Sequence, residues 1–100
     1  MMNQKMVAGI LRKQMPYLKS AYGVKRIALF GSFATGKQKK GSDIDMVVTF
    51  AKPLGLKFIE LAEYLEKALG RKIDILTPEG VKGIRIKKVS RDIIRNLHYV

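Results

Sequence analysis

Apolar residues along this chain recur at two spacings, one typical of strands and one typical of helices. Residues 44–50 alternate with the two-residue period of a strand that has one buried face. The residues that face one way are Ile44, Met46, Val48 and Phe50. Short apolar runs that end at turn-forming residues predict two further strands, at 24–30 and 72–77.

Helical spacing of apolar residues predicts the remaining elements. The clearest helix covers 56–69, where Gly70 provides a stop. Pro16 is expected to end a first helix at about residue 14, because proline removes a backbone donor and restricts the residue before it. The other expected helices are 17–22, 32–35 and 81–97.

The order of these elements predicts an α/β (α+β) fold. Because the 56–69 helix joins the second and third strands, we expect a small mixed sheet of three or four strands with helices packed on one face. One hundred residues, of which 47% are hydrophobic, provide one modest core. We therefore expect a single domain over 1–100.

The first strand runs into the segment GSFATGKQKKGSDID, at 31–45. Gly31 and Ser32 stand at the expected turn. A glycine there lets backbone N–H groups approach an anion, and a serine can cap the short helix that follows while offering its hydroxyl to a phosphate oxygen. This turn is therefore a candidate phosphate site.

Carboxylates make the second half of that segment more informative. Asp43 and Asp45 are two residues apart on a strand, so both project from the face opposite Ile44 and Met46. If the strand at 72–77 pairs beside them, Asp74 joins the cluster on a face open to ligand. Close carboxylates repel one another, and oxygen ligands suit Mg²⁺, two of which can clamp a phosphoryl displacement.

Taken in order, these motifs carry a family resemblance: Gly31-Ser32, then Gly36, then Ser42-Asp43-Ile44-Asp45, then Asp74. The pattern resembles the active-site signature of the DNA polymerase beta-like nucleotidyltransferases. Over nearly its whole length the chain is similar to their minimal form, the minimal nucleotidyltransferase (MNT) domain family. One position departs from the pattern, because Thr35 stands where the family usually has arginine.

The resemblance implies a polymerase beta palm-like fold and a set of site residues. Asp43, Asp45 and Asp74 would be catalytic and would hold two Mg²⁺ ions, while ATP would be the substrate. The residues implied to bind the nucleotide are Gly31, Ser32, Gly36 and Ser42. Thr35 brings no charge, so the resemblance does not fix the geometry of the loop or the affinity for the nucleotide.

Minimal members of this family resemble antitoxins that transfer AMP to a tyrosine of a HEPN-family RNase toxin. That implies adenylyl transfer to a hydroxyl of a partner protein. The alternative is a non-catalytic module that neutralises its partner by contact alone, and Thr35 gives it some weight. A third hypothesis, nucleic-acid binding, rests on charge without a binding motif.

Charge and composition limit the other classes. Lys and Arg number 20 against 8 Asp and Glu, so the net charge is +12, which favours acidic or polyanionic partners. Lys37, Lys39 and Lys40 either reach such a partner or are simply solvated. Without an apolar run of about 18 residues or a secretion signal, we expect a cytoplasmic protein and no membrane contact. The chain has no cysteine and one histidine, His98, so thiolate and His-rich metal sites are excluded.

Overall fold

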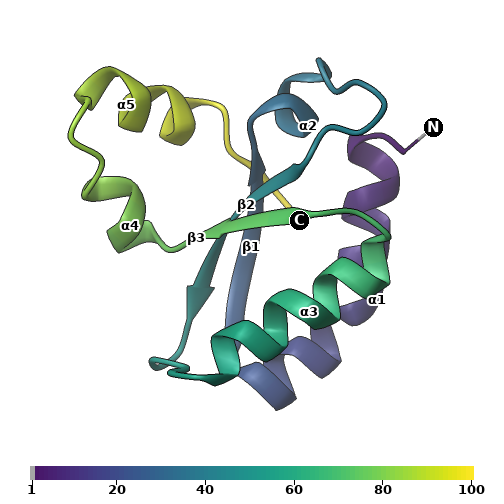
Figure 1. Cartoon of the computed structure of the whole chain (residues 1–100). Helices are drawn as coiled ribbons and strands as arrows, with labels where there is room; N and C mark the ends of the chain where they lie inside the picture. Colours follow the sequence, from purple (N-terminus) through teal and green to yellow (C-terminus); the bar gives the residue numbers. More distant parts are fainter. Residues whose placement is uncertain (1) are drawn as a thin grey trace.

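A computed structural model of the chain describes residues 2–100, so that residue 1 of the predicted domain lies outside the described residues. A four-stranded sheet with the strand order β3-β2-β1-β4 lies at its centre (Figure 1). β2 pairs parallel with β3, whereas β1 pairs antiparallel with both β2 and β4. The elements, in chain order, are α1 (Gln4–Tyr22), β1 (Val24–Phe30), α2 (Ser32–Thr35), β2 (Ile44–Phe50), α3 (Lys57–Leu69), β3 (Ile73–Leu76), α4 (Pro78–Lys82), α5 (Lys87–Arg95) and β4 (His98–Tyr99).

The main core lies between one face of this sheet and the helices α1 and α3. Ile44, Met46 and Val48 of β2 are completely buried there, as their alternation predicts. Helix α1 contributes Leu11 and Leu18, which are seven residues apart, and α3 contributes Leu61, Leu65 and Leu69, which are four residues apart. The predicted fold class, α/β with a small mixed sheet, is confirmed. Helices α1 and α3 pack on one face as predicted, whereas α4 and α5 lie over the other face.

Helix α1 passes through Pro16 without ending, so the predicted break between 3–14 and 17–22 is wrong. Pro16 and Arg12 are both exposed, so water can bond the Arg12 carbonyl that proline leaves without a donor. Beyond the proline, Leu18 and Tyr22 are buried in the core. Their packing stabilises the last turn enough to outweigh the proline.

The C-terminal segment also differs from the prediction of one helix over 81–97. Thr77 caps α4, since its Oγ1 accepts a hydrogen bond from the Gly80 N–H at 3.0 Å, and Pro78 begins the helix. Helix α5 starts only at Lys87, and the chain then returns to the sheet as β4, where Tyr99 pairs with Ala28. A local pattern could not reveal this return, because it depends on an edge of the sheet that lies far away in sequence.

The second face of the sheet is only partly open. A cavity separates it from α4 and α5, lined by Ala28 and Val47 of the sheet and by Val81 and Ile93 of the helices. The face is exposed where Asp74 lies, at the other end of β3 from α4. No helix within residues 2–100 is long and apolar enough to cross a membrane.

Candidate active site

Asp45 and Asp74 are partners across two neighbouring parallel strands. They share one position in the β2–β3 register, so both side chains project from the same face as close neighbours. Burial, the charge of Asp74 and the charge of Asp43 together raise the pKa of Asp45 to about 6. The site therefore holds more negative charge than the chain itself neutralises.

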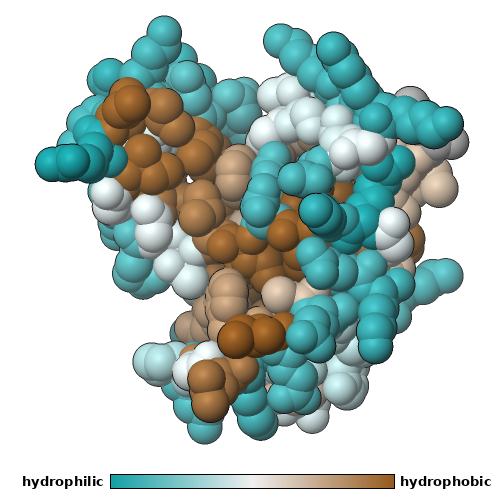
Figure 2. Space-filling model, viewed as in Figure 1, coloured by the Kyte–Doolittle hydropathy of each residue, from teal (hydrophilic) through white to brown (hydrophobic). Residues whose placement is uncertain are grey.

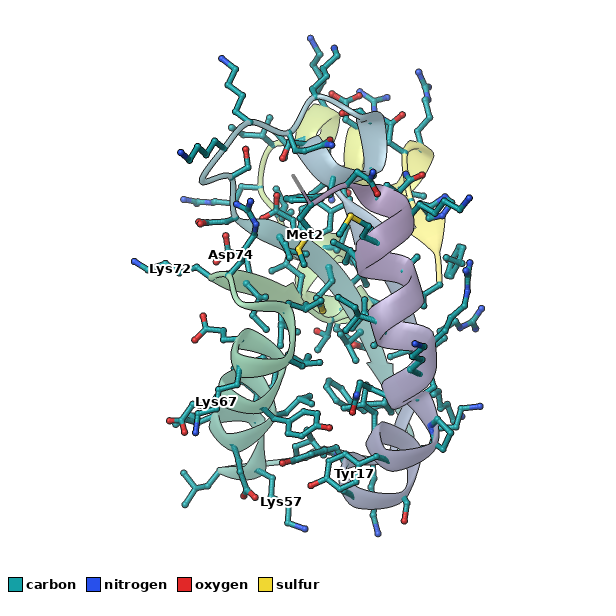
Figure 3. The ribbon with its side chains drawn as sticks, turned by 90° about the vertical axis from the view of Figure 1, so that its right-hand side faces the viewer. Met2, Tyr17, Lys57, Lys67, Lys72 and Asp74 are labelled. Atoms are coloured by element: carbon teal, nitrogen blue, oxygen red, sulfur yellow. The ribbon has the colours of Figure 1, made fainter. Side chains whose placement is uncertain are left out.

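Asp43 and Asp74 are the more exposed members of the predicted set. Asp74 projects from the edge strand β3, away from α1 (Figure 3). Asp43 lies in the loop just before β2 and acts on Asp45 through its charge. Within residues 2–100, no three His, Cys, Asp or Glu side chains lie close enough together to hold a metal ion. The structure thus places Asp45 and Asp74 side by side on neighbouring strands, with Asp43 in the loop just before β2.

The chemistry of these donors fits a hard divalent cation. Carboxylate oxygens are the ligands that Mg²⁺ prefers. The raised pKa of Asp45 reflects burial first and then repulsion from the neighbouring carboxylates, and a bound cation relieves that repulsion. Movement of the exposed Asp43 side chain toward Asp45 and Asp74 would complete a set of three.

Gly31 lies directly against Asp45. Its backbone has φ +70° and ψ −148°, a conformation that side-chain-bearing residues rarely adopt. A Cβ atom at this position would lie 2.3 Å from Oδ2 of Asp45 and 3.2 Å from its Cγ. Asp45 therefore occupies the space that the glycine leaves free, and the register of β1 and β2, with Phe30 opposite Asp45, brings them together.

Helix α2 is closed by bonds to the carbonyl of Gly31. The N–H groups of Ala34 and Thr35 both donate to it at 3.2 Å, and Oγ1 of Thr35 donates to it at 3.2 Å. Thr35, where the family pattern has arginine, thus stabilises the turn itself. Ser32 is the first helical residue, and Gly31 holds the cap position without a side chain. The prediction that Ser32 caps this helix is wrong for that reason.

Gly36 and Ser42 bound the loop between α2 and β2. Gly36 ends α2 with φ +75°, and its N–H donates to the Ser32 carbonyl. Ser42 closes the loop, because its Oγ accepts from the Lys39 N–H at 2.8 Å and its N–H donates to the Lys39 carbonyl at 2.9 Å. Both residues therefore shape the approach to Asp43.

Arg71 is a site residue that the sequence reasoning missed. Its Nη1 donates to the Ser42 carbonyl at 3.4 Å, and its guanidinium lies 5.9 Å from the centre of the Phe33 ring. It thereby links α2 to the residue before Asp43. The signal was available in principle, because Arg71 precedes the strand that carries Asp74 and so falls level with Ser42 once β2 and β3 are paired as parallel strands.

Basic side chains surround the exposed end of this site. Lys40, Arg71 and Lys72 line a shallow depression together with Asp43. Lys72 extends beside Asp74 at the edge of the sheet in Figure 3. A positive rim of this kind raises the local concentration of polyanionic ligands.

Relatives with similar sequences are named as protein adenylyltransferases. A Thermococcus cleftensis protein named protein adenylyltransferase MntA is 38% identical over 89 residues, which are 88% of this chain and 90% of that protein. A Methanocaldococcus jannaschii relative, named provisionally as a protein adenylyltransferase, is 46% identical over 85% of this chain and 89% of its own length.

Solved structures share the fold. A provisionally assigned minimal nucleotidyltransferase has a TM-score of 0.70 at 26% identity, with 96% of this chain and 94% of that one covered. A toxin–antitoxin structure with AMP-PNP has a TM-score of 0.63 at 25% identity, covering 98% of this chain and 72% of that one. A complex of an MNT antitoxin with a tri-AMPylated Shewanella oneidensis HEPN toxin has a TM-score of 0.61 at 21% identity, covering 96% of this chain and 70% of that one, and shows likeness of fold.

The model of one protein family, the nucleotidyltransferase domain, matches residues 11–99. This range runs from α1 to β4 and contains the Gly31 turn, the Asp45–Asp74 pair and Arg71. The chain therefore belongs to the nucleotidyltransferase domain family.

Proposed function

We propose that this chain is a Mg²⁺-dependent protein adenylyltransferase. It moves AMP from ATP to a tyrosine hydroxyl of a HEPN-family RNase toxin, and acts as the antitoxin of that partner in the cytoplasm, where ATP is available. The observation that carries the proposal is the pairing of Asp45 with Asp74 beside the Gly31 turn. The names of the relatives and the AMP-PNP and HEPN complexes of similar structures support the donor and the partner.

Two Mg²⁺ ions would be held by Asp43, Asp45 and Asp74. The bound metal would neutralise charge on the triphosphate as the reaction proceeds. Asp45 is central to this set because it is the most buried of the three and feels the charge of both others.

The remaining site residues would position the triphosphate. We assign its contacts to Gly31 and Ser32, with Gly36 and Ser42 shaping the loop that covers it. Lys40 and Lys72 lie where they would attract the anion toward Asp43. Positioning and electrostatic stabilisation provide most of the rate enhancement in phosphoryl transfer, so few residues are needed.

In the proposed reaction, the tyrosine oxygen attacks the α-phosphorus of ATP. A new phosphorus–oxygen bond forms to tyrosine, the bond to the oxygen bridging the α- and β-phosphorus atoms breaks, and pyrophosphate leaves. Asp74 is assigned as the acceptor of the hydroxyl proton, because it is exposed on the edge strand where an acceptor protein can approach. Asp45, more buried, would stay on the nucleotide side.

The experiment combines the chain with its HEPN-family partner, ATP and Mg²⁺ and follows the mass of the partner. Wild type should add one or more AMP units to a tyrosine of the partner. Asp74→Asn should abolish this addition and still form the complex, whereas Glu63→Gln, an exposed position on α3, should act as wild type. An unmodified partner after incubation with wild type would refute the transferase.

Contact-only neutralisation is the second candidate. Two observations favour it. Within the described residues the three carboxylates do not lie close enough together to form a metal site, and Thr35 brings no positive charge to the turn. Under this alternative, wild type and Asp74→Asn would inhibit the partner RNase equally without modifying it. The same mixture therefore separates the two functions.

A further inference from the structure

Helix α5 and the residues just before it expose apolar and basic side chains together. Ile86 is 65% exposed, Val89 43% and Ile94 53%. The segment 85–95 also carries five basic residues against one acidic residue, Asp92. Figure 2 shows the apolar side chains gathered over the α5 region, at the upper left, beside hydrophilic neighbours. We call the exposed side chains of 85–95 the α5 face.

The α5 face is continuous with the candidate active site. A groove runs between α5 and the turn that follows β1. It is lined by Val89, Asp92 and Ile93 on one side and by Gly31 and Thr35 on the other. Gly31 in turn touches Asp45. A molecule seated on α5 would therefore lie beside the carboxylate pair without crossing the rest of the chain.

The exposed side chains of the α5 face indicate which kind of molecule binds there. Three exposed aliphatic side chains favour a protein surface, since a nucleic-acid backbone would use the basic residues and leave the aliphatic ones in water. A second copy of this chain is disfavoured, because each copy carries a net charge of +12 and the α5 faces would repel. The remaining occupant is a protein with an acidic surface around an apolar centre.

We infer that the α5 face docks the acceptor protein through an acidic, apolar-centred surface and so delivers its hydroxyl to the Asp45–Asp74 pair. This inference rests on the proposed function, since the acceptor is the protein that becomes modified. Aliphatic contacts would provide affinity, while the basic residues steer the partner and fix its orientation. The two roles give separate measurable effects.

The test measures affinity for the purified HEPN-family partner by titration calorimetry. Ile86→Glu should weaken binding about tenfold or more, because it removes an apolar contact and adds a negative charge facing an acidic surface. Ile59→Glu is the matched control, since Ile59 on α3 is 61% exposed and Ile86 is 65% exposed. The control should bind as wild type, and both variants should unfold at the temperature of wild type.

Charge is tested by the association rate. Lys88→Glu should slow association and flatten its dependence on salt, whereas Lys57→Glu, at the start of α3, should have the smaller effect expected of any lost charge. Equal effects of Ile86→Glu and Ile59→Glu on affinity, or no binding by wild type, would overturn the inference. So would tighter binding of a single-stranded RNA oligonucleotide than of the partner, or a dimer of the chain that Ile86→Glu disrupts.

Docking and catalysis can fail independently. If wild type leaves the partner unmodified but Ile86→Glu loses affinity, the α5 face is the interface and the transferase assignment is wrong. If wild type transfers AMP and Ile86→Glu does so with unchanged affinity and rate, the transferase stands and the docking surface is wrong. Asp74→Asn separates the two measurements, because it should bind the partner as wild type does and transfer no AMP.

Discussion

Replacing Gly31 with alanine is the sharpest test of how the turn and the carboxylates are joined. The backbone conformation at Gly31, with φ +70° and ψ −148°, costs a residue with a side chain about 1–3 kcal/mol. The added Cβ would also lie 2.3 Å from Oδ2 of Asp45, so Asp45 must rotate away. An off-rotamer side chain costs about 0.5–1.5 kcal/mol. We expect Gly31→Ala to lower the free energy of unfolding by about 3 kcal/mol.

Gly36 provides a matched control for this substitution. It has φ +75°, close to the value at Gly31, but a Cβ there would meet nothing within 4 Å. Gly36→Ala should therefore cost only the strain of the left-handed conformation, about 1–2 kcal/mol. Urea unfolding of both variants measures the difference, which contains the collision with Asp45 and the additional backbone strain at Gly31, where ψ is −148° against 13° at Gly36.

A double variant separates the two contributions further. In Gly31→Ala combined with Asp45→Ala, the Asp45 Oδ2 and Cγ atoms are gone and only its Cβ remains, at 3.4 Å, an ordinary contact. The two substitutions should couple by about 1 kcal/mol in favour of the double variant. Gly31→Ala alone should also weaken Mg²⁺-nucleotide binding, because Asp45 is displaced. If Gly31→Ala costs no more than Gly36→Ala and the cycle shows no coupling, the steric argument is refuted.

Three further substitutions test other parts of the structure. Asp45→Asn should raise the free energy of unfolding at neutral pH by about 1 kcal/mol, allowing for solvent screening. The folded-state pKa of Asp45, about 6, lies above its ordinary value of 3.8. Wild type should therefore lose stability as the pH rises from about 3.8 to about 6, and below about 3.8 Asp45→Asn should no longer be more stable than wild type. Arg71→Ala should slow AMP transfer on the order of tenfold with little loss of stability, because the segment before Asp43 loosens, and Arg71→Lys should restore part of the rate. Pro16→Ala should raise the free energy of unfolding by about 1–2 kcal/mol, seen in thermal unfolding, since it returns a hydrogen bond to the interior of α1.

Local periodicity was sufficient to predict the centre of the sheet. The alternation over 44–50 gave the buried face of β2, and the strand at 24–30 has the predicted bounds. The prediction that Asp74 joins the other carboxylates was conditional on the strand at 72–77 pairing beside them. A helical crossover favours such parallel neighbours, and the structure supplies the register that places Asp74 opposite Asp45. These predictions needed only short-range pattern and chain connectivity.

The wrong predictions for the first helix and for the C-terminal segment depended on contacts between distant segments. Proline lowers the intrinsic stability of a helix, but α1 continues because Leu18 and Tyr22 are buried beyond it. The C-terminal segment has helical apolar spacing, yet it divides at Gly83 and ends in a strand paired with β1. Arg71 was overlooked because its partner, the Ser42 carbonyl, is 29 residues away. The intrinsic propensity of a residue sets the free-energy cost of each local conformation, and tertiary packing decides whether that cost is offset.

Gly31 and Asp45 are 14 residues apart in sequence but form one structural unit. Sequence reasoning required glycine at the turn so that backbone could approach a phosphate, and it required Asp45 separately as a metal ligand. In the structure, the position of the carboxylate itself requires a residue without Cβ at 31. The phosphate contact proposed for Gly31 and the metal ligation proposed for Asp45 are therefore not independent of each other. Any side chain added at the turn displaces the central carboxylate, so a variant made to probe nucleotide contact at Gly31 also probes Asp45.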